Sequence, residues 1–178
     1  MFLSLIRNRR SIRRYEQRPV EDEKLKILVE AVLRSPSSMG NNPWEFIVVT
    51  DPSVIEKLSR SKPHGATFLK NAPLCIVVCA DPGKSTVWIE DASIASIFLH
   101  LAAESIGLGS CWIQIRDRMH NEDISAEAYI SELLEIPQNI KVEAIIAIGH
   151  PAEKKTPHGK ATLQYEKVFK EAYGKRSE

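Results

Sequence analysis

The sequence predicts a layered domain of the α/β or α+β class. Four short segments are rich in apolar and β-branched residues, and segments with a helical spacing of apolar residues lie between them. This alternation is typical of a sheet covered by helices. The pattern leaves open whether the strands pair in parallel or antiparallel. The strands are expected at residues 44–50, 74–80, 110–115 and 142–148.

The first half of the chain predicts two helices around the first strand. Apolar residues recur at helical spacing over residues 21–34, and a proline ends the pattern. Residues 35–43 are rich in turn formers. The Asp-Pro pair at 51–52 opens a second helix that extends to about residue 58. The strand at 74–80 is apolar at every position, which predicts a central strand covered on both faces.

A long helix is expected from about Val87 to Ile106, and it is apolar almost all round. Such a helix is either buried on all sides or lies in a subunit interface. Ile94, Ile97, Phe98 and Leu101 are the large residues that a chain of this size would have difficulty covering. The pattern therefore predicts a homodimer.

The last third of the chain predicts a short helix and a polar tail. Gly107 is a natural cap for the long helix. Residues 125–134 have helical spacing, and the strand at 142–148 is apolar throughout. From residue 153 onward the chain is polar with periodic apolar residues.

Length and composition are those of one globular domain. The chain has 178 residues, 43% of them hydrophobic, and a formal net charge of +1. One folding unit over residues 1–178 is expected. The near-neutral charge argues against nucleic acid as a partner. No apolar run is long enough to span a bilayer, and residues 2–6 lack the features of a signal peptide, so a cytoplasmic protein without a membrane partner is expected.

Several common catalytic and binding motifs are absent from the sequence. Cys75, Cys79 and Cys111 lie in apolar contexts and are expected to be reduced thiols of the core. The five histidines show no ligand spacing, so no metal site is expected. The glycine pair Gly107 and Gly109 follows a helix and not a strand, which excludes a dinucleotide fingerprint.

The most prominent polar feature is a cluster of arginines near the N-terminus. The ordinary interpretation is a solvated basic helix end. The alternative is a clamp for a phosphate or another anion, because forked guanidinium donors and a serine hydroxyl stand together there. The cluster comprises Arg7, Arg9, Arg10, Arg13, Arg14 and Arg18, with Ser11 between them.

A second polar feature is the loop over residues 35–43. Its serines and asparagines supply donors and acceptors between two prolines. An ordinary loop has the same composition. The helix before it and the strand after it would nevertheless hold it rigidly enough to face a planar polar ligand.

Five motifs in order resemble the FMN-dependent nitroreductase family, which includes flavin reductases. The resemblance covers nearly the whole chain. The motifs are Arg-Arg-Ser-Ile-Arg-Arg-Tyr at 9–15, Ser-Pro-Ser-Ser at 35–38 with Asn-Pro-Trp-Glu-Phe-Ile-Val-Val at 42–49, Asn-Ala-Pro-Leu-Cys-Ile-Val-Val at 71–78, Gly-Leu-Gly-Ser-Cys-Trp at 107–112 and Ala-Ile-Gly-His-Pro-Ala-Glu at 147–153.

The resemblance implies an α+β fold with a mostly antiparallel central sheet flanked by helices. It also implies an intertwined homodimer with the long helix at its core and the C-terminal tail around the partner. FMN would lie at the subunit interface. Arg9, Arg10 and Ser11 would meet its phosphate and ribityl chain, and Arg13 would lie near N1 and O2 of the ring. A cation there stabilises the negative charge that reduction adds.

The resemblance places further residues around the flavin. Pro36, Ser37 and Ser38 would come from the other subunit. Asn42 would contact the ring or the ribityl chain, and Asn41 adjoins the position of a family asparagine.

The remaining assignments concern the glycine motif and the tail. Backbone groups of Gly109 and Ser110 would approach the reactive face of the flavin, with small residues leaving room for a nicotinamide. Lys155 and Lys160 are both candidates for the basic tail residue that meets the phosphate. Gly65 and Phe68 replace an asparagine and a lysine of longer relatives, which suggests a compact subfamily with an open pocket.

The function expected from the resemblance is an FMN-dependent oxidoreductase with NADH or NADPH as electron donor. The acceptor would be a small electron-poor molecule such as a nitroaromatic, a quinone or an enone, reduced by ping-pong hydride transfer. No side chain would serve as a catalytic nucleophile, since the cofactor carries the chemistry. The alternative is a non-catalytic nucleotide- or anion-binding module built on the arginine cluster.

Overall fold

The four expected strands form one antiparallel sheet in the order β1-β2-β4-β3. The computed structural model, which describes residues 2–176, gives β1 as Trp44–Val49, β2 as Leu74–Ala80, β3 as Gly109–Gln114 and β4 as Lys141–Gly149. Each neighbouring pair is antiparallel. The structure thus decides the pairing that the strand patterns left open and confirms the α+β class.

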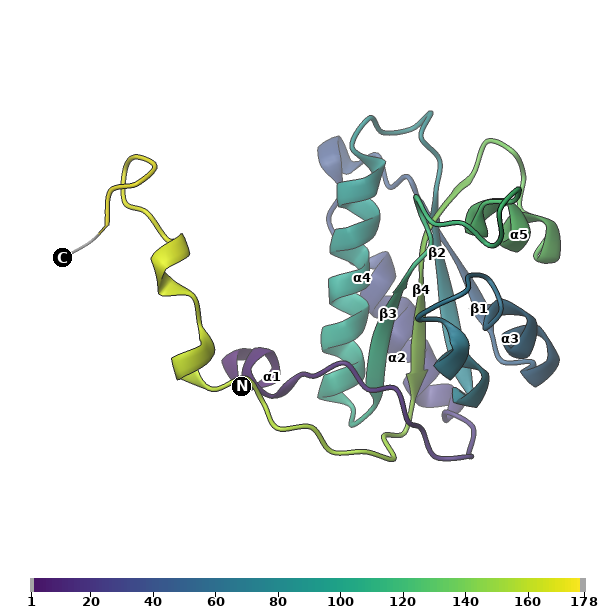
Figure 1. Ribbon diagram of the computed structural model, residues 1–178, viewed down its shortest axis with the longest axis horizontal. Helices are drawn as coiled ribbons and strands as arrows, with labels where there is room; N and C mark the ends of the chain where they lie inside the picture. Colours follow the sequence, from purple (N-terminus) through teal and green to yellow (C-terminus); the bar gives the residue numbers. More distant parts are fainter. Residues whose placement is uncertain (1, 177–178) are drawn as a thin grey trace.

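Helices cover both faces of the sheet (Figure 1). Helices α2 (Asp22–Leu33) and α4 (Trp88–Ser105) pack on one face and share a core with it. Helices α3 (Pro52–Leu58) and α5 (Ala126–Leu133), together with the 3-10 helix η2 (Thr67–Asn71), cover the other face. The expected helices are therefore present, with boundaries shifted by one or two residues.

The central strands supply side chains to both cores. Every residue of β2 is buried, as its continuous apolar sequence predicts. Successive side chains of a strand point to opposite faces. Cys75 and Val77 accordingly belong to the core under α3 and α5, whereas Ile76 and Val78 belong to the core under α2 and α4.

A glycine cap turns the chain from α4 into β3. The Leu108 N–H donates to the Ala103 carbonyl at 2.8 Å, and the Gly107 N–H donates to the Glu104 carbonyl at 3.2 Å. Gly107 has a φ of +75°, which a residue without a Cβ adopts at low cost. This turn delivers Gly109 and Ser110 to the edge of the sheet.

Helix α4 is buried on one side only. Ala92 and Leu99 are fully buried against the sheet and α2. Ile94, Ile97 and Phe98 are 38%, 44% and 38% exposed and lie on the outer face of the helix. The apolar outer face excludes the first of the two sequence interpretations, burial on all sides within one chain.

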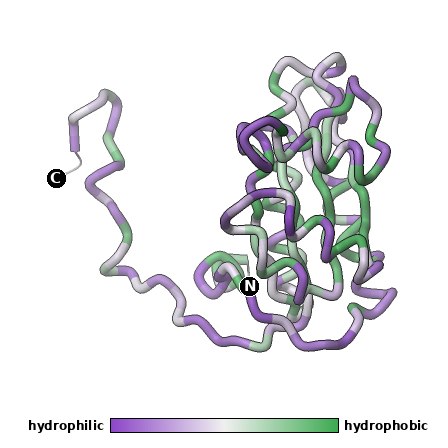
Figure 2. Tube along the Cα trace, turned by 45° about the vertical axis from the view of Figure 1, so that its right-hand side comes forward, coloured by the Kyte–Doolittle hydropathy of each residue, from purple (hydrophilic) through white to green (hydrophobic). Residues whose placement is uncertain are grey.

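Two terminal segments were not assigned as helices from the sequence. The short helix α1 (Phe2–Asn8) lies beside α4, and the tail leaves the body of the protein (Figure 1). The tail contains the 3-10 helices η3 (Lys160–Thr162) and η4 (Tyr165–Lys167) and is mostly hydrophilic with isolated hydrophobic residues (Figure 2). Its exposed apolar side chains are Leu163, Tyr165, Val168 and Tyr173. No helix among the described residues has the length and hydrophobicity to cross a bilayer.

We predict that Gly149→Ala destabilises the fold, because Gly149 ends β4 in a tightly packed position. A Cβ there would lie 2.6 Å from Pro73 Cδ and 2.9 Å from Tyr15 Cδ1. Such overpacking costs about 1–3 kcal/mol of unfolding free energy, which urea denaturation measures. Gly159→Ala is the control, since no atom lies within 4 Å of its Cβ position. Equal denaturation midpoints for the two variants would contradict this packing.

Candidate functional site

The arginine segment, residues 9–14, is fixed to the outer edge of β3. The Ile12 N–H donates to the Ser110 carbonyl at 3.0 Å, and Ser11 and Ser110 form a parallel bridge. Tyr15 strengthens this attachment, because its hydroxyl donates to the Ile12 carbonyl at 2.6 Å. The segment therefore holds its side chains in fixed positions beside the C-terminal end of α4.

Gly109 makes this close attachment possible. A Cβ at Gly109 would lie 2.8 Å from Ile12 Cβ. The sequence suggested that a small residue here leaves room for a nicotinamide. The structure gives a different reason, which is the approach of the arginine segment to the start of β3.

One arginine of the cluster has a structural role. The Arg18 guanidinium lies 2.8 Å from Glu16 Oε2 and 3.5 Å from Glu21 Oε1. It also lies 2.7 Å from Nδ1 of the buried His150, whose Nε2 is 3.0 Å from Glu21 Oε2. Arg18 is therefore bound within the protein and is not part of a clamp.

The other guanidiniums differ in how strongly they are bound. Arg10 donates to the Thr156 carbonyl and so anchors the start of the tail. The Arg9 guanidinium is half-buried and has no ion pair with any described residue. Arg13 lies with its guanidinium carbon 5.8 Å from the centre of the Phe68 ring. Arg9 and Arg13 thus have no ion pair with the described residues, as is also true of the exposed Arg7 and Arg14.

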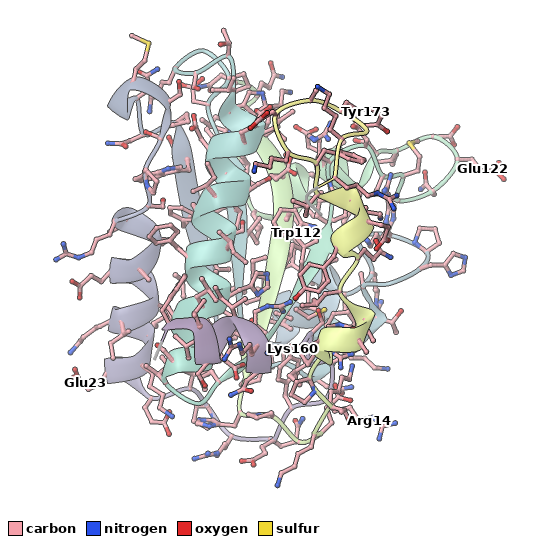
Figure 3. The ribbon with its side chains drawn as sticks, turned by 90° about the vertical axis from the view of Figure 1, so that its left-hand side faces the viewer. Arg14, Glu23, Trp112, Glu122, Lys160 and Tyr173 are labelled. Carbon is pink, nitrogen blue, oxygen red and sulfur yellow. The ribbon has the colours of Figure 1, made fainter. Side chains whose placement is uncertain are left out.

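The structure separates the two tail lysines. Lys155 Nζ donates to the Ser11 carbonyl at 2.9 Å and lies 3.5 Å from Glu153 Oε1. Lys160 is exposed in η3 of the tail (Figure 3), and the tail leaves the body of the protein (Figure 1). Of the two candidates, only Lys155 is brought to the arginine segment of its own chain.

Glu153 organises the same region from the other side. Its Oε1 accepts hydrogen bonds from the backbone N–H groups of Arg13 at 2.6 Å and Arg14 at 3.2 Å. The pKa of Glu153 is lowered, mainly by the hydrogen bond from the Arg13 N–H and then by the charge of Lys155. The carboxylate therefore fixes the backbone that carries Arg13.

These residues surround a small cleft. Its volume is about 170 Å³. Sites that enclose a small molecule usually have at least about 300 Å³, so one chain supplies only part of such a site. The lining residues are Asn8, Arg10, Ile12, Glu104, Gly107, Leu108, Gly109, Pro151, Glu153 and Lys155.

His100 belongs to this region and was missed from the sequence. It is buried on α4, and its Nδ1 lies 2.7 Å from Ser110 Oγ. Burial, and then the positive charge of Arg9, lowers the pKa of His100 to about 4, so the ring is neutral near pH 7. The Ser110 side chain is therefore engaged with the core, and Ser110 offers a ligand its backbone only. A single histidine in an apolar helix gives no sequence signal for this pair.

Cys111 is not an activated thiol. It is buried, and burial raises the pKa of its thiol despite the nearby Arg13. A nucleophilic cysteine needs a lowered pKa. The expectation that Cys75, Cys79 and Cys111 are free core thiols is confirmed. Within residues 2–176 no cluster of side chains suits a metal ion.

The polar loop lies at the opposite end of α4. The Ser38 N–H donates to Asp91 Oδ1 at 2.8 Å, and the Ser85 hydroxyl donates to Asp91 Oδ2 at 2.8 Å. Asp91 is 2% exposed in the first turn of α4. The loop is thus rigid, as the sequence predicts, and a buried carboxylate is the cause.

Within the loop, both asparagines make local hydrogen bonds. The Asn42 N–H donates to Ser37 Oγ at 2.8 Å, and Asn42 Oδ1 accepts from that hydroxyl at 2.9 Å. The Asn41 N–H donates to the Ser38 carbonyl. In this chain Asn42 closes the turn, while Pro36 and the Asn41 side chain are exposed.

One chain does not bring the two groups of candidate residues together. Asp91 holds the loop near the start of α4. Glu104, near the end of α4, lines the small cleft beside the arginine segment. With a rise of 1.5 Å per residue, the two positions are about 20 Å apart along the helix axis. A ligand that meets both groups at close range needs a second copy of the chain.

Known proteins resemble this chain in sequence and in fold. The model of the family described as the nitroreductase family matches residues 6–62 and 56–150. An FMN-dependent nitroreductase from Clostridium difficile R20291 is 46% identical and has a TM-score of 0.95, with 96% of this chain and 99% of that chain covered.

Two further relatives are informative. A protein of Archaeoglobus fulgidus with the provisional name NADH dehydrogenase/NAD(P)H nitroreductase is 38% identical over 157 residues, which are 86% of this chain and 87% of that protein. A structure from Desulfovibrio desulfuricans, provisionally described as a nitroreductase in complex with FMN, is 27% identical, covers 97% of both chains and has a TM-score of 0.77. Because the family model spans most of the sequence and these relatives span nearly all of it, the chain belongs to the nitroreductase family.

Proposed function

We propose that this protein is an FMN-dependent oxidoreductase that takes electrons from NADH or NADPH and passes them to a small electron-poor acceptor. The observation that carries the proposal is the group of basic residues at the edge of β3. Arg10 and Lys155 line the small cleft there, and the half-buried Arg9 next to Arg10 has no ion pair among the described residues. A relative named as an FMN-dependent nitroreductase, another named for NAD(P)H and a neighbour in complex with FMN support the cofactor and the donor.

The residues of the cleft fit the phosphate end of FMN. Arg10 and Lys155 line the cleft with Glu104 and Glu153, and the adjoining Arg9 and Ser11 add a guanidinium and a hydroxyl from the same segment. Arginine forms paired, charge-assisted hydrogen bonds with phosphate oxygens. The small volume of the cleft suits a phosphate and part of a ribityl chain, with the ring extending towards the partner subunit.

In this proposal, Arg13 acts on the ring of the cofactor. FMN, when bound, supplies the atom that accepts a hydride, and its reduction adds negative charge at the N1–C2=O edge. Glu153 fixes the Arg13 backbone, and Phe68 lies against its guanidinium. A cation held in this way favours the added charge without moving.

Donor and acceptor would occupy the same position in turn, which gives ping-pong kinetics. The chain contributes binding, orientation and charge, and no side chain is required as a nucleophile; Cys111 in particular is a protonated core thiol. The electron acceptors expected for this chemistry are nitroaromatics, quinones and enones.

A homodimer is part of the proposal. Ile94, Ile97 and Phe98 form an exposed apolar face on α4. If two α4 helices pack antiparallel through this face, the polar loop of one chain meets the arginine segment of the other. The tail, which leaves the body and carries exposed apolar side chains, would then reach around the partner.

A visible spectrum of the purified protein tests the proposed function. We expect absorbance bands of bound flavin, loss of these bands under anaerobic conditions with NADH or NADPH, and their return with a quinone or a nitroaromatic. A protein that neither retains nor takes up FMN would contradict the proposal and favour a non-catalytic anion-binding module.

Arg9→Ala should weaken FMN through the phosphate. Loss of one charge-assisted contact costs about 1.5–3 kcal/mol, or about ten- to a hundredfold in affinity. Riboflavin has no phosphate and should bind almost equally to both proteins, as flavin fluorescence quenching will show. Arg7→Ala, which removes the same charge from α1 outside the cleft, is the control. If FMN and riboflavin weaken equally in Arg9→Ala, the residue has a structural role.

Phe98→Glu should dissociate the dimer and release FMN at the same time. A carboxylate without a partner is costly in an apolar interface, so we expect the dimer dissociation constant to rise by at least about a hundredfold. Light scattering and the flavin content of each fraction measure both effects. Ile124→Glu is a matched control, because Ile124 is 41% exposed on a loop outside α4. A flavin-loaded monomer would refute the shared site.

A further inference from the structure

A second polar pocket lies on the other side of the sheet from α4. Its volume is about 340 Å³, which is within the range of small-molecule sites. It lies between the end of α3, η2 and the loop that follows β3. We call it the lysine pocket and define it by Glu56, Arg60, Lys62, Thr67, Lys70 and His120.

The lysine pocket carries an excess of positive charge. Arg60 pairs with Glu56 at 2.6 Å, and these two charges offset each other. Lys62 and Lys70 have no ion pair with any described residue. Burial, and then the charge of Arg118, lowers the pKa of Lys62.

His120 adds a polar atom without a partner. Its ring stacks on Tyr129 with centroids 4.1 Å apart and an interplanar angle of 10°, so its orientation is fixed. Its Nδ1 is buried and makes no hydrogen bond within the described part of the chain. Buried polar atoms usually have a partner. The lining also holds the Lys62 and Lys70 ammonium groups and the Thr67 hydroxyl, and its one carboxylate, that of Glu56, is paired with Arg60.

The lysine pocket is connected to the arginine segment through η2. Helix η2 contributes Thr67 and Lys70 to the pocket, and Phe68 between them lies against Arg13. On the other side of the pocket, Lys62 Nζ donates at 2.8 Å to the carbonyl of Gln114, the last residue of β3. One short helix thus carries both the contact to Arg13 and two residues of the pocket lining.

We propose that the lysine pocket binds the phosphate groups of the electron donor NADH or NADPH while the nicotinamide lies at the flavin. This inference rests on the proposed function. The shared chemistry is a phosphate ester of adenosine, which both donors contain. The excess of positively charged donors, with the one carboxylate of the lining paired to Arg60, favours an anion with several oxygen acceptors over a neutral or apolar ligand.

Adenosine fragments of the donor test the pocket without any electron transfer. Calorimetric titration of the purified flavin-loaded protein uses 2′,5′-ADP, ADP and adenosine. We expect the phosphorylated fragments to bind and adenosine to bind at least about tenfold more weakly. Tighter binding of 2′,5′-ADP than of ADP would assign the pocket to the 2′-phosphate of NADPH. Equal binding would assign it to the diphosphate that both donors share.

The variant Lys70→Gln locates the binding. It should weaken the phosphorylated fragments about tenfold and raise the KM for the donor by a similar factor, with kcat and the KM for the acceptor unchanged. Lys57→Gln is the control, since it removes the same charge from an exposed position on α3 outside the pocket. Equal effects of the two variants, or no binding of any phosphorylated fragment, would overturn the assignment.

These outcomes are separate from those that test the proposed function. If flavin is bound and bleached by NAD(P)H but Lys70→Gln behaves like the parent protein, only the pocket assignment is wrong. If the protein holds no flavin, the proposed function is wrong. The same titrations on the flavin-free protein then still decide whether the pocket binds phosphate.

Discussion

The contact between Ile12 and the start of β3 is the constraint on which the candidate site depends. The Ile12 N–H is bonded to the Ser110 carbonyl, and only glycine at position 109 lets the two segments approach this closely. The contact sets the position of Arg9 and Arg13 relative to α4. It also brings the Ser11 carbonyl to Lys155, and so ties the start of the tail to the same edge.

Together with helix α4, this edge of the sheet forms half of the candidate site. Asp91 holds the polar loop at one end of the helix, and the small cleft beside the arginine segment lies at the other end. The apolar face of Ile94 and Phe98 lies between them and is open to solvent in a single chain. Burying that face against a second copy would remove apolar surface from water, and it would complete two sites at once.

Much of the fold could be predicted from the sequence, whereas contacts of the site could not. Continuous apolar segments and helical spacing predicted the strands and the helices, because burial produces a regular pattern of apolar residues in the sequence. The sequence pattern did not show whether the strands pair in parallel or antiparallel. The antiparallel pairing was expected only from the family resemblance. The pairs His100–Ser110 and Asp91–Ser38 join residues from different elements, and only the folded chain shows them. The flavin roles of the thirteen candidate residues stay predictions, as does the single domain over residues 1–178.

Mixed dimers test the shared site most directly. One chain would carry Arg9→Ala, and the other would carry Ser38→Pro, which removes the N–H that Asp91 accepts. If each site combines the arginine segment of one chain with the loop of the other, one site of the mixed dimer keeps both intact parts. The account therefore predicts one tightly bound FMN in each mixed dimer and weak binding in both parent variants. Two weakened sites in the mixed dimer would show that each chain builds its site alone and would contradict the account.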